Sequence, residues 1–414
     1  MQGKALPGFR DFYPEDLTLR NHIFATWRSI AGRYGFEEYD GPPLESLELY
    51  TQKSGDEIVQ QLYAFRDKGD RDVALRPEMT PTLARMVAAR VQALKKPIRW
   101  FSIPQLFRYE RQQRGRLREH FQLNMDIIGE AGPLADAELM AAAVDIMRAL
   151  GLGPQDVKLR VSDRRLVKAL LTKVGVPEEK HPAAFAAIDR SERVPQDVLQ
   201  EMLKEAGFSA NQTTAVFSTA TLREEAFQHA PDVAEPLSQA VQALKAMGLE
   251  DFVSIDLTIV RGLAYYTGIV WELFDAKKTF RAIAGGGRYD SLLDLPALGF
   301  GMGDVVLGEL LKERGVAPQA PIELGAFLVA VGGDDLPIVL ELAHALRDRG
   351  IAVEYGLRHA AVRKQLELAG SRGAARAIIV GPEERAAGQA VVRDLRTGTE
   401  AHVPLRQLLN GYFD

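Results

Sequence analysis

The chain has 414 residues, of which 51 are basic and 56 are acidic, so its formal net charge is −5 at pH 7. This length allows two or three domains with sizeable hydrophobic cores, and the acidic balance excludes a histone-like coating of nucleic acid by the whole surface. The chain contains no cysteine, which excludes disulfides, thiolate metal sites and thiol catalysis and fits a reducing compartment.

The N-terminal residues 1–20 carry early acids and no apolar core, so neither a secretory signal nor a transit peptide is predicted. No segment reaches the roughly 18 to 20 apolar residues that cross a bilayer. The seven histidines are scattered, without the spacing of a zinc-binding helix. We therefore expect a cytoplasmic protein with no membrane partner and no structural metal.

The first element expected is a helix from Leu17 to Tyr34, which ends before Gly35. Further on, a short strand that begins at Val73 meets Arg76-Pro77-Glu78, and a helix is predicted to begin at Thr80-Pro81 as N-cap and N1. Glu78 thus lies at a strand-to-helix corner, where an acid most often serves as a cap.

The segment 107–126, FRYERQQRGRLREHFQLNMD, alternates with a period of two in both halves. One face carries only polar residues: Arg118, His120, Gln122, Asn124 and Asp126. The opposite face carries Phe121, Leu123, Met125 and Ile127. A basic loop, 111–116, joins the halves, so an antiparallel hairpin is predicted. Alternation alone fits a solvated outer face of a sheet equally well.

Charge favours a ligand on this hairpin. Between residues 99 and 118 the only acid is Glu110, against the basic residues Arg99, Arg108, Arg111, Arg114, Arg116 and Arg118. Such a local field attracts phosphate, although the chain as a whole is acidic.

After the hairpin, a helix is expected from Asp136 to Leu150 and a strand from Val157 to Val161. Residues 163–250 are almost entirely helical in pattern and are interpreted as an inserted helical module. Its charged faces fit ordinary solvated helices, although a few basic side chains could contact a nucleic acid backbone. They are Arg164, Arg165, Lys168 and Lys173.

Residues 256–310 return to strand character. Arg261 lies in an apolar region, and a buried arginine requires either a core carboxylate or a bound anion. The run Gly285-Gly286-Gly287 before Arg288 either forms a tight turn or lets a ligand approach the backbone closely. A second glycine-rich stretch, 299–303, precedes a helix expected from Asp304.

The last part of the chain follows a linker at 315–323. Strands and helices then alternate, with strands at 326–331, 351–355, 377–380 and 390–395 and a final helix. This order predicts a small, mostly parallel α/β domain.

Several motifs, taken in order, resemble those of class II aminoacyl-tRNA synthetases and, within that class, of the histidyl-tRNA synthetase family across essentially the full length. They are LPGFRDFYP, ALRPEMT, FRYER, GRLREHFQLNMDIIG, IVRGLAYYTG, GGGRYDSLL and RKQLELAGSRGA. RGLAYYTG is the most specific of them, and QLNMD and GFGMGD resemble the plant-organellar type.

The resemblance implies an α/β (α+β) fold: a catalytic domain at 1–320 built on an antiparallel sheet, with a helical insertion at about 163–250, and an α/β anticodon-binding domain at 323–414. It also implies a homodimer that uses the segment 17–43 as its interface. The implied partners are L-histidine and tRNA(His), with ATP as substrate and Mg2+ on its outer phosphates.

The resemblance also implies roles for single residues. Arg108 and Arg261 would flank the α-phosphate, Glu110 would hold the adenine amino group, and Arg116 and Arg118 the polyphosphate. The histidine-binding set would comprise Glu78, Thr80 and Gln122 on the α-ammonium group, Asp126 and Tyr266 on the imidazole, and Tyr265 and Tyr289 beside it. The tRNA contacts would be Gln113 and Arg114 near the acceptor end and Arg363, Lys364 and Gln365 in the last domain, where an ordinary surface helix is an equal alternative.

Two departures from the family pattern matter. The adenine-stacking phenylalanine of many class II enzymes falls at His120, so we expect imidazole stacking there. The third motif, GFGMGDVVL, has Val305-Val306 where the family has a glutamate–arginine pair. Either another cation, such as Arg116 or Arg288, replaces the missing arginine at the γ-phosphate, or ATP use is impaired. We expect replacement, because the plant-organellar form carries the same substitution.

Two rival functions remain open at this point. One is the histidine-sensing regulatory paralogue of ATP phosphoribosyltransferase, which shares YYTGIV and GGGRYD. Arg108, Glu110 and Arg261 together, the long insertion and a full last domain argue against it. The other is a nucleic-acid-binding adaptor that uses the last domain alone, where the charges nearly cancel and binding would be weak.

Overall fold

The computed structural model describes residues 3–53, 59–110, 115–191, 194–218, 223–261, 266–290, 294–318 and 324–412. The chain divides into two compact units, residues 1–318 and 319–414, each of which is described by itself. Within the described residues, the helices are all too short or too polar to cross a membrane.

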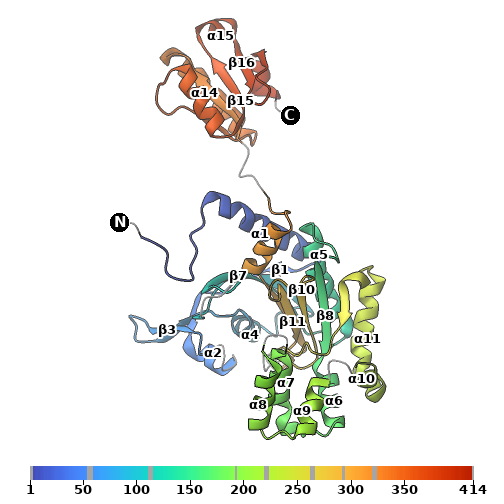
Figure 1. Ribbon diagram of the computed structural model, residues 1–414. Helices are drawn as coiled ribbons and strands as arrows, with labels where there is room; N and C mark the ends of the chain where they lie inside the picture. Colours follow the sequence, from blue (N-terminus) through green and yellow to red (C-terminus); the bar gives the residue numbers. More distant parts are fainter. Residues whose placement is uncertain are drawn as a thin grey trace. The chain divides into compact units, whose positions relative to one another are not determined.

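The first unit is built on a large sheet with strand order β1-β5-β7-β12-β11-β10-β8-β9, and β6 pairs with β7 outside this path. The strands are β1 (Glu37–Glu38), β5 (Ile98–Ser102), β6 (Gln105–Phe107), β7 (Glu119–Ile128), β8 (Val157–Asp163), β9 (Val253–Ile255), β10 (Ile269–Asp275), β11 (Ala284–Arg288) and β12 (Ala297–Gly303). All neighbours from β5 to β8 pair antiparallel, whereas β1 and β9 add parallel edges. The predicted antiparallel sheet is confirmed (Figure 1).

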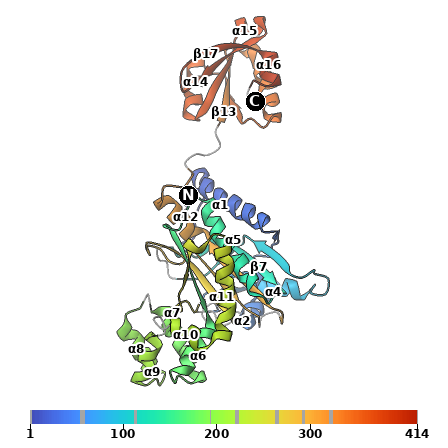
Figure 2. The same cartoon turned by 90° about the vertical axis from the view of Figure 1, so that its right-hand side faces the viewer.

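Helices cover one face of this sheet. They are α1 (Pro14–Arg33), α5 (Pro133–Ala149) and α12 (Asp304–Glu313). Their apolar sides, for example Trp27 of α1, form one core with Leu123, Met125 and Ile127 of β7. Figure 2 shows α1 beside α5 and α12. The opposite face of the sheet is therefore left for the site.

A smaller sheet, with strand order β2-β4-β3, is formed by the part of the chain between β1 and β5. Its elements are β2 (Leu44–Ser46), β3 (Tyr63–Arg66) and β4 (Asp72–Leu75), with α2 (Leu47–Lys53) and α4 (Thr80–Ala88). Helix α4 begins at Thr80 as expected, but the N-cap position is Met79 and Pro81 lies in the first turn. The acid of this corner, Glu78, thus precedes the cap rather than forming it.

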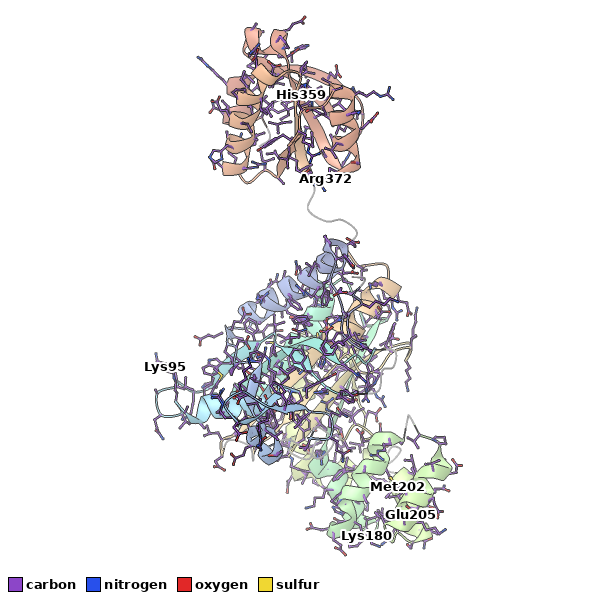
Figure 3. The ribbon with its side chains drawn as sticks, turned by 90° about the vertical axis from the view of Figure 1, so that its left-hand side faces the viewer. Lys95, Lys180, Met202, Glu205, His359 and Arg372 are labelled. Atoms are coloured by element: carbon purple, nitrogen blue, oxygen red, sulfur yellow. The ribbon has the colours of Figure 1, made fainter. Side chains whose placement is uncertain are left out.

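Between β8 and β9 the chain is helical, as the sequence predicts. The elements are α6 (Arg164–Lys173), η1 (Glu178–Lys180), α7 (His181–Arg190), α8 (Gln196–Glu205), α9 (Ala210–Ser218), α10 (Arg223–His229), α11 (Pro231–Ala246) and η2 (Glu250–Phe252). Helices α7, α8 and α9 pack on one another, whereas α11 packs on α5. Figure 3 shows Lys180, Met202 and Glu205 in the resulting lobe, where the Lys180 ammonium lies 5.3 Å from the centre of the Phe208 ring.

The second unit is a five-stranded sheet, with order β14-β13-β15-β16-β17, and flanking helices. Its elements are β13 (Leu324–Ala330), η3 (Gly333–Asp335), α13 (Leu336–Asp348), β14 (Val353–Tyr355), α14 (Val362–Ser371), β15 (Ala374–Val380), α15 (Pro382–Ala387), β16 (Gln389–Asp394), β17 (Glu400–Pro404) and α16 (Leu405–Asn410). Only β13, β14 and β15 are parallel, because β16 and β17 return antiparallel. The expected α/β domain is confirmed, with three of its five strands parallel, but β17, an edge strand with a mostly exposed face, was not among the predicted strands.

Candidate functional site

A cavity of about 830 Å³ lies on the sheet face opposite the helices α1 and α5. Many of the residues predicted for the site line it. They are Glu78, Thr80, Arg108, Glu110, Arg116, His120, Gln122, Asp126, Arg261, Tyr266 and Tyr289. The structure therefore brings together residues that lie more than 200 positions apart in the chain.

Strand β7 supplies the polar floor of this cavity. His120, Gln122, Asn124 and Asp126 line the cavity, and the residues between them lie in the core on the opposite face. Phe121 packs there, with its ring centroid 5.2 Å from that of Phe24. The alternation thus predicted correctly that His120, and not Phe121, faces the cavity. Asn124, which accepts a 2.8 Å hydrogen bond from the Gln122 amide, was not among the predicted site residues.

Glycines of the neighbouring strands make room for these side chains. A methyl group at Gly299 would overlap the Asp126 carboxylate, one at Gly301 would lie 2.5 Å from the Gln122 amide, and one at Gly285 would overlap the Arg261 guanidinium. All three glycines lie in ordinary extended strands, so the sequence uses glycine here for close approach rather than for a turn. This decides between the two interpretations of the glycine run.

We expect Gly285→Ala and Gly299→Ala to impair different functions, because each methyl group displaces a different side chain. Gly285→Ala should lower kcat by about tenfold or more through Arg261, while Gly299→Ala should raise the KM for the amino acid through Asp126. Steady-state kinetics on both substrates measures this split. The variants control for each other, and an identical profile in both would contradict the assignment.

Asp126 is a buried carboxylate beside two buried tyrosines. It is 5% exposed, Tyr266 is 7% exposed and Tyr289 is 2% exposed. Burial raises the pKa of Asp126 to about 7, and a hydrogen bond donated by the Tyr289 hydroxyl opposes this shift. Burial also raises the pKa of Tyr266. A buried carboxylate has lost its hydrogen bonds to water, so a ligand that donates an N–H group to it is bound favourably.

Arg261 is held in an unusual conformation. Its φ of 55° lies in the left-handed region, which non-glycine residues rarely adopt. Its Nη1 atom lies 2.6 Å from Glu272 Oε1, and its Nε atom is buried without a hydrogen-bond partner. Burial by itself lowers the pKa of Arg261, but Tyr266 and Glu272 outweigh it and raise the pKa above its ordinary value. Backbone strain of this kind is characteristic of functional sites.

The helical insertion reaches the cavity and supports this conformation. Arg164, at the start of α6, donates from Nη1 to the carbonyl oxygens of Val260 (2.6 Å) and Arg261 (2.7 Å). Its guanidinium lies 4.7 Å from the centre of the Phe185 ring in α7. Residues 188, 189 and 191 line the cavity. The insertion is therefore part of the site and anchors the peptide that carries Arg261.

The second cationic wall comes from the residues around the hairpin. Arg108 Nε donates to the Pro77 carbonyl at 2.8 Å, and Arg116 Nη1 lies 3.0 Å from Glu110 Oε2. Burial, together with the nearby charge of Arg108, lowers the pKa of His120 to about 3. His120 is thus a neutral aromatic ring at physiological pH, while the guanidinium groups keep the region positive.

Two predicted ATP contacts do not lie on the cavity wall. Arg118 stacks on the Tyr109 ring at 4.2 Å, and its Nε donates to the Glu110 carbonyl at 3.3 Å. Arg288 points to the helix-covered face, where it forms a buried 2.5 Å ion pair with Asp136. The expectation that Arg288 replaces the missing third-motif arginine was wrong, because strand parity directs it away from Gly285 and Gly287.

The predicted tRNA contacts fare differently. Arg363 is exposed and lies 3.0 Å from Glu367, and Lys364 is also exposed. Gln365 was wrongly predicted, because it is 5% exposed and its amide donates to the carbonyls of Ala330 and Ala360. Helical periodicity turns this position inward. Gln113, Arg114 and Tyr265 lie outside the described residues.

Several lining residues escaped prediction. Glu272 could have been found as an acid in an otherwise apolar strand, WELF, but its partner was not visible. Arg160, paired at 2.6 Å with Asp256, and Arg281 had no distinguishing local pattern. In the part of the chain that the structure describes, no three His, Cys, Asp or Glu side chains are grouped so that they could hold a metal ion alone.

Comparison with known proteins agrees with these features. A family model described as histidyl-tRNA synthetase matches residues 8–303, and one described as anticodon binding domain matches residues 326–411. A histidine–tRNA ligase of Opitutus terrae is 45% identical, covering 98% of this chain and 97% of its own. The chloroplastic/mitochondrial histidine–tRNA ligase of Arabidopsis thaliana is 40% identical, covering 97% of this chain and 85% of its own.

Solved structures share the fold. Histidyl-tRNA synthetase from Nostoc superposes with a TM-score of 0.82 at 22% identity and covers 99% of both chains. A protein from Bacillus halodurans described as an ATP phosphoribosyltransferase regulatory subunit/histidyl-tRNA synthetase has a TM-score of 0.77 at 23% identity, covering 92% of this chain and 99% of its own. At such identities the likeness concerns the fold alone.

Proposed function

Because this chain belongs to the histidyl-tRNA synthetase family and is a histidine–tRNA ligase, we propose that the cavity of its first unit carries out both steps of the ligation. In the first step the histidine carboxylate attacks the α-phosphorus of ATP, a new O–P bond forms, and pyrophosphate leaves. In the second, the terminal ribose hydroxyl of tRNA(His) attacks the adenylate carbonyl and AMP leaves. Neither step needs a protein nucleophile, so alignment and charge must supply the rate.

One observation carries the assignment of roles: Arg108 and Arg261 come from distant segments and line the same cavity as the buried Asp126. We place the two guanidinium groups on either side of the α-phosphate. They can stabilise the negative charge that builds up on its oxygens as pyrophosphate departs. Glu272 supports this role because its ion pair fixes Arg261.

The amino-acid end of the cavity suits histidine. Asp126 would accept a hydrogen bond from one imidazole nitrogen, and Tyr266 would contact the other, while Tyr289 holds the carboxylate. Glu78, 5% exposed, would meet the α-ammonium group with Thr80 and Gln122. A neutral isostere of the side chain would leave Asp126 unpaired, at a cost of about 1 to 3 kcal/mol or more.

The nucleotide end would use Glu110 for the adenine amino group, Arg116 for the phosphates and His120 for stacking on the base. We expect His120→Ala to raise the KM for ATP by about 5- to 100-fold, since stacking of a base on an aromatic ring contributes about 1 to 3 kcal/mol. ATP-dependent pyrophosphate exchange measures it. His120→Phe, which keeps an aromatic ring, should retain most of the affinity, and unchanged ATP binding in His120→Ala would contradict the stacking role.

Mg2+ would enter with ATP rather than occupy a protein-made cage. The ion is usually bound through one or two carboxylates together with substrate phosphates. Glu272 lines the cavity beside Arg261, which is assigned to the α-phosphate, and its carboxylate fits this mode. When bound, Mg2+ neutralises part of the phosphate charge.

For tRNA, we propose the division of labour that the family implies: a catalytic domain at 1–320 with an insertion at about 163–250, and an anticodon-binding domain at 323–414. The family model for the anticodon binding domain supports the second range. Arg363 and Lys364, both exposed on α14, are the contacts we retain there. Gln113 and Arg114 remain candidates for the acceptor end.

We propose that the enzyme works as a homodimer in the cytoplasm, where translation uses its product. Support for the dimer comes from apolar side chains that are exposed before and at the start of α1. Leu6 is 71% exposed and Tyr13 is 64% exposed, so both side chains are available for contact with a second copy. Sedimentation equilibrium at several protein concentrations tests the dimer.

Histidine-dependent exchange of labelled pyrophosphate into ATP, followed by charging of tRNA(His), tests the proposed site. The regulatory rival would bind histidine without exchange, and the adaptor would show neither activity. The second unit matches an anticodon-binding domain, which argues against the regulatory paralogue.

A further inference from the structure

The start of β7 is held differently from the rest of the strand. The β12–β7 ladder ends at Gln122, so residues 119–121, which include His120, lie beyond it. On the other edge these three residues still pair with β6. Where the ladder with β12 stops, the backbone N–H of Phe121 donates to the Asp304 carboxylate at 2.9 Å. A side chain at the start of α12 therefore takes over from the neighbouring strand.

Arg10, in the segment before α1, joins this carboxylate to a second one on β7. Its Nε and Nη2 atoms donate to the two carboxylate oxygens of Glu119 at 2.6 and 3.3 Å, and its Nη1 donates to Asp304 Oδ2 at 2.9 Å. Glu119 is 1% exposed and Asp304 is 5% exposed. Two buried carboxylates need a cation between them, and removal of that cation leaves uncompensated buried charge. Arg10 thus ties the start of β7 to the start of α12.

The same N-terminal segment makes two further contacts with this part of β7. The carbonyl oxygen of Gly8 accepts a 2.9 Å hydrogen bond from the backbone N–H of Arg118. The ring of Phe12 lies 6.2 Å from that of Phe121, and the Arg10 guanidinium lies 4.8 Å from the centre of the Phe12 ring. The segment therefore supports the face of β7 that lies opposite the cavity.

We propose that Arg10 is a positioning residue for the nucleotide, because it fixes the short strand segment from which His120 meets the adenine base. The proposal rests on the stacking role assigned to His120 above. Arg10 does not line the cavity, so it acts on the base only through His120. Its hydrogen bonds hold Glu119 and, through Asp304, Phe121, which are the two neighbours of His120 in the chain.

Two properties of Arg10 support this role. Only a planar guanidinium fork can donate to both oxygens of one carboxylate and to a second carboxylate at the same time. In addition, burial is the main cause of the low pKa of His120, and the charges of Arg108 and Arg10 lower this pKa further. Arg10 is therefore close enough to His120 to act on the ring electrostatically.

The test compares ligands that do and do not carry adenine. In Arg10→Gln, the KM for ATP and the inhibition constant for AMP should both rise by about 5- to 50-fold, because a displaced His120 loses stacking on the base. The inhibition constant for pyrophosphate and the KM for histidine should stay within about twofold. A general loss of folded protein would not distinguish these ligands, so equal changes for AMP and pyrophosphate would overturn the role of Arg10.

A double-mutant cycle tests whether Arg10 acts through His120. In the His120→Ala background, Arg10→Gln should change the KM for ATP by less than about twofold, since the ring that Arg10 positions is already absent. Two losses that simply multiply would contradict the proposal. If His120→Ala alone left the KM for ATP unchanged, the stacking role itself would fail, so the two failures are distinguishable.

Arg10→Lys covers the case in which Arg10→Gln does not fold. Lysine keeps a positive charge between the two buried carboxylates but lacks the fork. The KM for ATP and the inhibition constant for AMP should therefore rise by a smaller factor, about 2- to 10-fold. Unchanged constants in a folded Arg10→Lys variant would overturn the proposal.

The matched control is Arg385→Gln in the second unit. Arg385 also bridges two acids, with Nε 3.2 Å from the buried Asp335 and Nη1 4.0 Å from Asp334, and it does not line the cavity. Its constants for pyrophosphate exchange should equal those of the unmodified enzyme. A rise in the KM for ATP as large as that in Arg10→Gln would show that the effect is not specific to Arg10, and would overturn the proposal.

Discussion

Replacing Arg261 with alanine is expected to lower the rate of histidine-dependent pyrophosphate exchange by about 1000-fold, with the fold intact. A preorganised donor aimed at developing charge is typically worth two to three orders of magnitude in kcat, or about 3 to 4 kcal/mol. Arg261 has the features of such a donor: it is half-buried, charged and fixed by Glu272 at 2.6 Å. Arg108→Ala should show a loss of similar size.

The backbone of Arg261 provides a sharper control. Alanine at a φ of 55° is strained, whereas glycine is not. Arg261→Gly should therefore have a higher melting temperature than Arg261→Ala. Both variants should be equally inactive, since activity depends on the guanidinium. Glu272→Gln should lose less activity than either variant because the cation remains. Near-normal exchange in Arg261→Gly would refute the place of this residue at the phosphate.

Replacing Asp126 with asparagine is expected to lower kcat/KM for histidine by about 100-fold at pH 8. Hydrogen bonds to a charged group contribute about 1.5 to 3 kcal/mol, and the buried partner groups would be left without the ionised acceptor. The KM for ATP should change little, because Asp126 lies at the amino-acid end. An unchanged histidine KM would remove Asp126 from the recognition of the imidazole.

The pH dependence follows from the pKa of about 7. Only ionised Asp126 accepts an imidazole N–H, so histidine binding should weaken as pH falls below about 7. The substrate imidazole titrates nearby, and the ratio of the unmodified enzyme to Asp126→Asn cancels that contribution. In Tyr289→Phe the donor that lowers the pKa of Asp126 is lost. The midpoint of the pH profile should then move to higher pH.

The same shift predicts an effect on stability. In the unfolded chain Asp126 ionises near pH 4, whereas in the folded chain it stays protonated up to about pH 7. Between these values the folded state binds more protons, so stability decreases as pH rises through this window, by up to about 4 kcal/mol. Asp126→Asn removes this decrease, and its melting temperature relative to the unmodified enzyme should rise from pH 4 to pH 7.

Much of the site could be predicted because local sequence patterns, namely strand periodicity and short motifs, determine it. Strand periodicity alone placed His120, Gln122 and Asp126 on one face and Phe121 on the other, and the antiparallel pairing of β7 confirms it. The motif resemblance added Arg261, which is half-buried among apolar neighbours. These inferences need only the register of a single strand and the identity of its residues.

The errors have a common physical origin in tertiary contacts. Arg288 follows the glycine run directly, but successive side chains of a strand point to opposite faces. The Arg288 side chain therefore forms an ion pair with Asp136 on the other face of the sheet. Gln365 lies beside two exposed basic residues but occupies the inner position of its helix turn. Arg164 could not be selected, because its role depends on contacts with the carbonyls of a distant loop that the sequence does not display.

The glycines beneath Asp126, Gln122 and Arg261 also limit how this enzyme can change. Since a methyl group at Gly285 or Gly299 already collides with a binding side chain, the specificity of the pocket cannot be redesigned from its base. An engineered enzyme for a bulkier histidine analogue would have to gain volume from the surrounding tyrosines. Selection for activity on such analogues should therefore yield substitutions at Tyr266 or Tyr289 and none at the glycines.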